Sequence, residues 1–482
     1  MNRSFRSIWN EALGAWVAAS EVCAARGKKS SSATLGAVVL ATAAFGGASS
    51  AWAASECGTV AAGGTVTCNG DATPATDASP FSSGIFYSAQ DVKLIVDGTA
   101  GTVTVQPTVG LIGVANRGGA GVGTREVQIN GDVHITVQAS SAGVPISAVQ
   151  AYQQAGGNAL AVQNGGTITG VGQGSFGVVA RADGGGSATA IQNAGSISTG
   201  GTGGDGVALF AETYSTGAAI ATQNGGSITT NGSHVVYALA RGNGSATATQ
   251  TGGTAAALST TFVNAGIVAQ TLGSGDARAV QSGGTIVTNG PGGAVSAVAS
   301  GSGNATVEQS GGSTTANGND AVGLAAGTAG AGTATVVQAA GLAASATGTN
   351  SNGISAKSGG TGRYVVSAAG TAIGGSGSTA AAVHTSGAGG GTIDIAGSAV
   401  LDGTRSGTAI LDETGAVTVT TAGTLMGNIL TNAGNDSINL VAGSVAGNID
   451  AGADNDTFTW TGGTLAGGFY GQNGSDTALV AA

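Results

Sequence analysis

Short runs of alternating apolar and polar residues, separated by glycine-rich corners, make up most of this chain. In residues 177–182, valine and alanine alternate with Arg181, as expected of a β-strand with one buried side. The clearest unit holds three such runs, at residues 187–192, 195–199 and 206–212. Glycine allows the positive φ angles that tight corners need, so three strands and three corners predict one triangular coil.

A glutamine-centred motif repeats this unit through the middle of the chain. Its glutamines are Gln163, Gln192, Gln223, Gln250, Gln281, Gln309 and Gln338, whose successive sequence numbers differ by 29, 31, 27, 31, 28 and 29. A period that drifts by one or two residues indicates a solenoid whose corners vary while its strands stay in register. Alternation places Gln192 on the same side as Ala188 and Ala190, which predicts an inward ladder of stacked amides. The alternative is that the glutamines lie exposed at turns.

The last segment of the chain has a shorter period. It is marked by Gly423, Gly443 and Gly463, and by Asp436, Asp456 and Asp476, and the sequence numbers within each set differ by 20. Aspartates in glycine-rich loops suggest calcium, but one carboxylate per coil offers too few oxygens for an ion that takes six to eight. We therefore expect these aspartates to act in turns, with tighter coils of the same architecture and no metal site.

Composition supports this picture and excludes several others. The 482 residues include 92 glycines and 5 prolines, and 8% are charged, against about 25% in ordinary soluble domains. An apolar fraction of 41% disfavours disorder, and the scarcity of proline excludes collagen. The expected fold is all-β, a right-handed parallel β-helix made of three-strand coils. After residue 53 there are nine basic and 22 acidic residues, and this net charge of −13 disfavours nucleic acid as a partner.

The pattern of the N-terminus predicts an export signal. Residues 30–55 carry no charge and follow the basic residues Arg26, Lys28 and Lys29. The small residues Ala51 and Ala53 flank Trp52 in the pattern that a signal peptidase accepts, so cleavage is predicted there. A transmembrane anchor is the alternative, but the apolar run is short for a span.

A second segment precedes this signal and resembles the extended signal peptide region of Gram-negative type V secretion proteins. The resemblance rests on Met1-Asn2-Arg3, Ile8-Trp9-Asn10, Gly14-Ala15-Trp16-Val17-Ala18, Ser20-Glu21 and Arg26-Gly27-Lys28-Lys29. It implies export to the periplasm, followed by passage through an outer-membrane β-barrel translocator to the cell surface. The periplasm is oxidising, so Cys57 and Cys68 are expected to form a disulfide, with Gly63-Gly64 reversing the chain between them. The alternative is two unpaired thiols.

No catalytic or cofactor motif stands out. His134, His234 and His384 are far apart, and there is no Gly-x-Ser-x-Gly elbow and no phosphate-binding loop. We therefore expect neither catalytic residues, nor a metal site, nor a cofactor, and no enzyme activity.

Four segments are expected: an extended signal peptide at 1–53, an N-terminal cap with the first coils at 54–150, a solenoid with the longer, glutamine-marked period at 151–400, and a solenoid with the shorter period at 401–482. The favoured function is an autotransporter passenger that acts as an adhesin on an unknown receptor or glycan of a host or neighbouring cell. An exoprotein with a separate transporter, or a β-helix enzyme acting on polysaccharides, are the alternatives. Residues 477–482 show no membrane-barrel pattern, so we expect a passenger fragment or a truncated reading frame.

Overall fold

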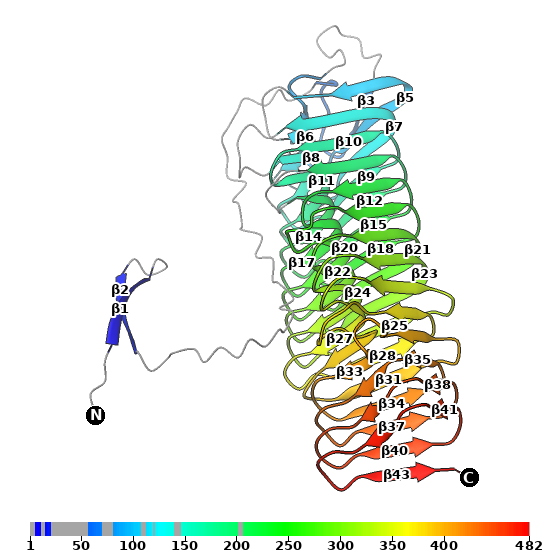
Figure 1. Cartoon of the computed structure of the whole chain (residues 1–482). Helices are drawn as coiled ribbons and strands as arrows, with labels where there is room; N and C mark the ends of the chain where they lie inside the picture. The colour runs from blue at the N-terminus through cyan, green and yellow to red at the C-terminus, as the bar shows by residue number, and fades with distance from the viewer. Residues whose placement is uncertain are drawn as a thin grey trace. The chain divides into compact units, whose positions relative to one another are not determined.

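The computed structural model forms two units, Met1–Ala37 and Val38–Ala482 (Figure 1). The residues it describes are 5–10, 15–20, 56–69, 81–107, 112–118, 121–138, 146–200 and 206–481. In the first unit, β1 (Phe5–Asn10) pairs antiparallel with β2 (Ala15–Ser20). The predicted cleavage site at Ala51 and Ala53 lies outside the described residues.

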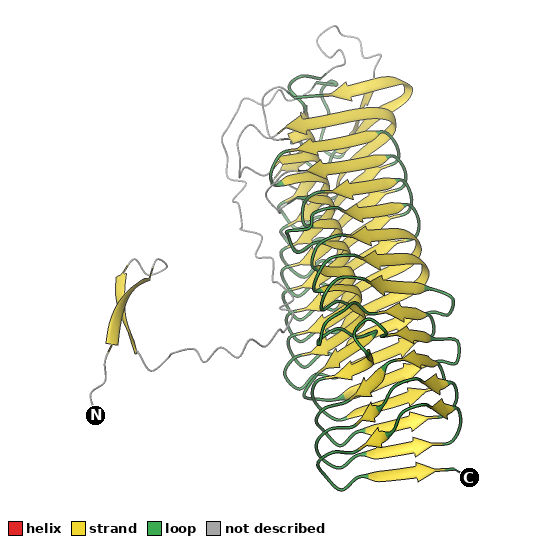
Figure 2. Cartoon of the chain, viewed as in Figure 1, coloured by secondary structure: helices red, strands yellow, loops and turns green. Residues whose placement is uncertain are grey.

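The second unit is a parallel β-solenoid with three faces (Figures 1 and 2). The first face consists of β3 (Thr65–Asn69), β5 (Lys93–Val105), β7 (Arg125–Gln138), β9 (Ala159–Gln163), β12 (Ala188–Gln192), β15 (Ala219–Gln223), β18 (Ala246–Gln250), β21 (Ala277–Thr288), β23 (Ala305–Ala316), β25 (Ala334–Gln338), β28 (Tyr364–Ala368), β31 (Gly391–Ile395), β34 (Val417–Thr421), β37 (Ser437–Leu440), β40 (Thr457–Trp460) and β43 (Thr477–Val480). The second face consists of the C-terminal parts of β5, β7, β21 and β23, together with β10 (Thr167–Val171), β13 (Ser196–Gly200), β16 (Ser227–Thr230), β19 (Thr254–Ala257), β26 (Ala343–Ala346), β29 (Thr371–Ile373), β32 (Val400–Asp402), β35 (Thr424–Met426), β38 (Ser444–Val445) and β41 (Thr464–Leu465). The third face consists of β4 (Ile85–Tyr87), β6 (Ile112–Gly118), β8 (Ile146–Gln153), β11 (Ser175–Ala182), β14 (Val207–Thr213), β17 (His234–Ala240), β20 (Ala265–Thr271), β22 (Gly292–Ala299), β24 (Ala321–Thr328), β27 (Asn352–Ser358), β30 (Val383–Ser386), β33 (Thr408–Asp412), β36 (Asn428–Leu430), β39 (Ile449–Asp450) and β42 (Phe469–Tyr470).

Strands of one face pair in parallel with the matching strands of the neighbouring coils. The first two faces join into one 26-stranded sheet, and the third face is a separate 15-stranded sheet. No helix occurs in the described part of the chain, so no helix there could cross a bilayer. The predicted all-β solenoid of parallel three-strand coils is therefore confirmed.

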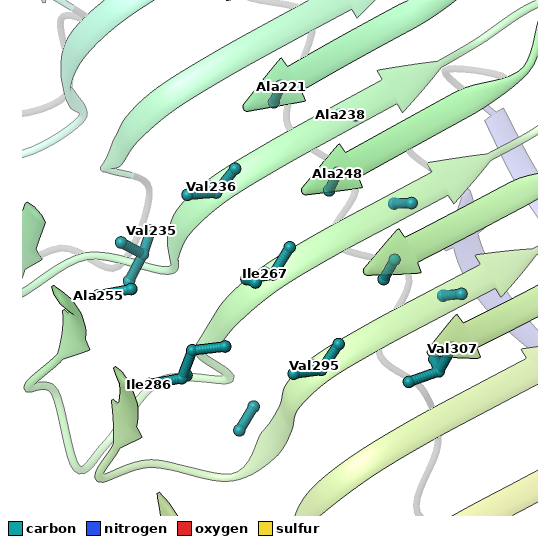
Figure 3. Close-up of a cluster of buried hydrophobic side chains, with 14 of the residues drawn as sticks. Ala221, Val235, Val236, Ala238, Ala248, Ala255, Ile267, Ile286, Val295 and Val307 are labelled. Carbon is teal, nitrogen blue, oxygen red and sulfur yellow. The ribbon is translucent and has the colours of Figure 1, made fainter. Parts of the chain in front are cut away.

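The interior is narrow and is filled by small and β-branched side chains. Figure 3 shows Ala221 and Ala248 on first-face strands, and Val236, Ile267 and Val295 on third-face strands. All five are fully buried and belong to one continuous apolar cluster. Because the faces lie close together, alanine opposite valine or isoleucine fills the space without strain.

Glycine at the corner after each glutamine is required by geometry. Gly195 has φ +85° and Gly226 has φ +74°. Residues with a Cβ disfavour this left-handed region. A Cβ on Gly226 would lie 2.3 Å from the carbonyl oxygen of Gly195 in the preceding coil. The repeated glycines thus allow successive corners to stack at strand spacing.

Candidate functional site

A disulfide joins Cys57 to Cys68 at the N-terminal end of the solenoid, with their Cα atoms 5.2 Å apart. The chain turns at Gly63, which has φ +72°. The backbone N–H of Cys57 donates to the Tyr87 hydroxyl at 3.0 Å, and that hydroxyl donates to the carbonyl of Gly58 at 2.9 Å. The disulfide therefore closes the first corner, and the Tyr87 hydroxyl anchors that corner to the coil that follows it.

The seven glutamines of the repeat stack in one column inside the solenoid. Each is at most 1% exposed, and each amide from Gln192 onward donates through Nε2 to Oε1 of the glutamine one coil earlier, at 3.0–3.2 Å. All seven also donate to a backbone carbonyl of the next coil, as Gln192 does to Ser227 at 3.3 Å. The column ends at Gln338, whose Oε1 has no hydrogen-bond partner because Ala368 occupies the next position.

A second amide column runs beside the first and was not foreseen from the sequence. Asn164 donates to Asn130 at 2.8 Å, Asn193 to Asn164 at 2.7 Å, and Asn224 to Asn193 at 2.8 Å. The Thr251 hydroxyl closes it by donating to Asn224 at 2.9 Å. The signal was present in the sequence, since an asparagine follows each of the first three glutamines directly.

The three aspartates of the shorter C-terminal coils lie at corners, but their carboxylates bond across coils. The N–H of Val417 donates to Asp436 at 2.8 Å, that of Asp436 to Asp456 at 2.8 Å, and that of Asp456 to Asp476 at 3.0 Å. Asp436 and Asp456 are buried, whereas Asp476 is exposed. These side chains therefore link successive corners, a role that a purely local turn does not describe.

The three histidines lie on separate strands. His134 is exposed and lies 3.0 Å from Asp132. His234 packs against the Tyr237 ring at 4.5 Å between centroids, and burial lowers its pKa to about 4. His384 lies 3.1 Å from Glu413. Within the described residues no group of three or more His, Cys, Asp or Glu side chains is arranged to hold a metal ion.

Arginine and tyrosine side chains alternate along the outer side of the third face and define an arginine–tyrosine column. The column runs along strands β6, β8, β11, β14 and β17, which are stacked in the N-terminal half of the solenoid (Figure 1). The Tyr152 ring lies between Arg117 at 5.3 Å and Arg181 at 4.9 Å. The Tyr214 ring lies between Arg181 at 4.4 Å and Arg241 at 5.2 Å. Cations over aromatic faces attract the ring quadrupole, so each step stabilises the next.

Two carboxylates, those of Asp183 and Glu212, form hydrogen bonds and ion pairs with this column. Arg181 donates through Nε to Asp183 at 3.0 Å, and Tyr152 also donates to Asp183. Glu212 accepts from Arg241 at 2.5 Å and lies 3.8 Å from Arg181. Alternation placed Arg181 on the side opposite the buried valine and alanine, and the side chains of Arg181 and Glu212 are largely buried in this network rather than solvated.

Burial makes the tyrosines of this network harder to ionise than an ordinary tyrosine. Burial, followed by the charge of Glu212, raises the pKa of Tyr214 to about 12. Burial also raises the pKa of Tyr152. Arg117, Tyr214 and Arg241 remain partly exposed, so the column offers a phenol and guanidinium groups, which together suit carboxylates and sugar hydroxyls.

Comparison with protein families matches residues 1–50 to the extended signal peptide of the type V secretion system. Comparisons with curated proteins and with solved structures found no match. The matched segment indicates export through the inner membrane for type V secretion, with the cell surface or the medium as destination. This route implies an outer-membrane translocator as a partner.

Proposed function

We propose that this chain, in which an extended signal peptide of type V secretion precedes a β-solenoid, is an autotransporter passenger that acts as an adhesin and not as an enzyme. The observation that carries the proposal is the arginine–tyrosine column on an exported rod. Three of the nine basic residues that follow residue 53 gather there, although the exported part is strongly acidic. A long rod with a fixed register can hold such groups at regular intervals, which suits a repetitive ligand.

The ligand expected at this column is a glycan or receptor on a host or neighbouring cell. Tyrosine edges and arginine donors are frequent in binding surfaces, since both combine apolar area with directional hydrogen bonds. The net negative charge of the exported part argues against a polyanion such as nucleic acid.

The test uses residues 54–482, the exported part, coated on beads and added to cultured epithelial cells and to bacterial cells. Beads carrying the wild-type chain should be retained on one of these surfaces well above uncoated beads. Arg117→Ala should reduce retention several-fold, because Arg117 stacks on Tyr152 at one end of the column. The control is Arg278→Ala, which removes an exposed pair with Glu308 on another face and should leave retention unchanged.

Retention no better than that of uncoated beads, or equal losses in both variants, would contradict the adhesin proposal. The enzyme alternative makes a separate prediction. A polysaccharide hydrolase or lyase would release new reducing or unsaturated ends from a panel of polysaccharides, and we expect the exported chain to release none.

A further inference from the structure

Three buried carboxyl groups lie inside the C-terminal coils, where coil length changes. Asp412 is the last residue of β33 and is fully buried, and Asp436 and Asp456 are 2% and 1% exposed. Each has one satisfied oxygen: the Thr385 hydroxyl donates to Asp412 at 2.7 Å, and backbone N–H groups donate to the other two. The second oxygen, Oδ2, of each has no hydrogen-bond partner.

Among the described residues, no cation pairs with Asp412. Tyr364 from β28 and Thr385 from β30 adjoin it, and the charges of Asp436 and Glu413 repel it. The Tyr364 hydroxyl is buried and makes no well-formed hydrogen bond. Lys357 and His384 are directed to Glu413, at 4.0 Å and 3.1 Å, and leave Asp412 unpaired.

The surroundings of the other two carboxyls are equally acidic. Backbone donors and the Thr431 hydroxyl favour the charged form of Asp436, and the charges of Asp456 and Asp454 oppose it. Asp456 is in turn opposed by Asp476 and Asp454. A buried carboxylate without a cation is costly, whereas its protonated form gains a donor where an unpartnered oxygen now lies.

We propose that the buried carboxyls of Asp412, Asp436 and Asp456 make the C-terminal coils a pH-sensitive segment. The folded coils are most stable when the carboxyls are protonated and become less stable as they ionise. The middle coils serve as an internal contrast, because their column is made of amides, which do not titrate. The two halves of one rod therefore respond differently to the same change in pH.

Electrostatics supports the direction of this response. Burial raises the pKa of Asp412 to about 7 and that of Asp436 to about 6, and it also raises the pKa of Asp456. A carboxyl whose folded pKa exceeds its unfolded value of about 3.9 contributes stability that is fully present below that unfolded value. This stability is lost as pH rises from the unfolded pKa through the folded pKa, here from about pH 4 to about pH 7.

Histidine acts with the opposite sign and has to be separated from this effect. Burial lowers the pKa of His384 and of His234, so each favours the folded state more as pH rises. The decisive quantity is therefore the difference between wild type and a carboxyl variant at each pH.

The exported part contains one tryptophan, Trp460 in β40, which packs near Phe458 at 6.3 Å between ring centroids. Its fluorescence reports on these coils during urea unfolding at pH 5, 6, 7 and 8. The ratio of folded to unfolded coils should fall at least about tenfold from pH 5 to pH 8, since one unit of pKa shift corresponds to tenfold.

Asp412→Asn keeps an oxygen acceptor for Thr385 but cannot ionise, and it should remove most of this fall. Asp436→Asn is the second variant, should the first fail to fold. Asp394→Asn is the matched control, because Asp394 is exposed on β31 and its replacement should preserve the wild-type profile. A difference between wild type and both buried variants that is constant from pH 5 to pH 8 would overturn the proposal.

Discussion

Replacing Gln250 by leucine tests whether the internal amide column holds the middle coils together. The Gln250 amide donates to Gln223 Oε1 at 3.0 Å and to the Thr285 carbonyl at 3.3 Å, and it accepts from Gln281 at 3.2 Å. Leucine has a similar volume, so the loss is mainly polar. It leaves the buried Gln223 Oε1 and the part-buried carbonyl oxygen of Thr285 without these donors, while Gln281 keeps its bond to Ser313.

A buried group that loses its partner costs about 1–3 kcal/mol and a part-buried one somewhat less, so Gln250→Leu should lower the free energy of local unfolding by about 2–5 kcal/mol. Gln338→Leu is the matched control at the column's end. It removes the same two kinds of donor bond, but it also removes an Oε1 that already lacks a partner, so its cost should be about 1–2 kcal/mol smaller.

The assay is amide hydrogen exchange, read on peptides that cover β15, β18 and β21 and, separately, β34 and β37. Gln250→Leu should speed exchange in the first group and leave the second almost unchanged, because each coil contacts only its neighbours. Equal costs for Gln250→Leu and Gln338→Leu, or unchanged exchange around β18, would refute the view that the column stabilises the solenoid.

Two further substitutions test the cap and the corners. Cys68→Ser, or reduction of the Cys57–Cys68 bond, should destabilise the N-terminal coils by about 2–3 kcal/mol, seen as faster exchange in β3 and β5 and no change beyond β18. Gly226→Ala should lower the unfolding free energy by about 1–3 kcal/mol, because it combines positive φ with a Cβ 2.3 Å from a carbonyl oxygen. Gly101→Ala, which meets no atom within 4 Å, should be nearly neutral in the same urea titration. A stable, wild-type-like Gly226→Ala protein would argue against the close stacking of corners.

Strand positions in the middle coils were predictable because the glutamine-marked strands pair in a constant register. Gln192 pairs with Gln223, and the alanines before them pair in the same register, as the glutamine spacing implied. Coil length varies from 27 to 31 residues. The strands and the glycine corner after each glutamine recur with the period, and the other corners absorb the variation.

The arginine–tyrosine column shows the limit of sequence reasoning. Tyr152 and Arg181 lie on neighbouring strands at paired positions, but Tyr214 and Arg241 follow the ends of β14 and β17, where no fixed period applies. Asp412 was missed for a similar reason, because it precedes the first aspartate of the shorter repeat and is recognised only when the coils are stacked.

The change from long to short coils has a mechanical consequence. A coil of 29 residues adds only about 4.8 Å to the rod, but once unravelled it spans about 100 Å of extended chain. A coil of 20 residues releases about 70 Å. Pulled from its two ends, the rod would lengthen in discrete steps, short ones from its C-terminal part and long ones from its middle, and so would absorb sudden loads without breaking a covalent bond.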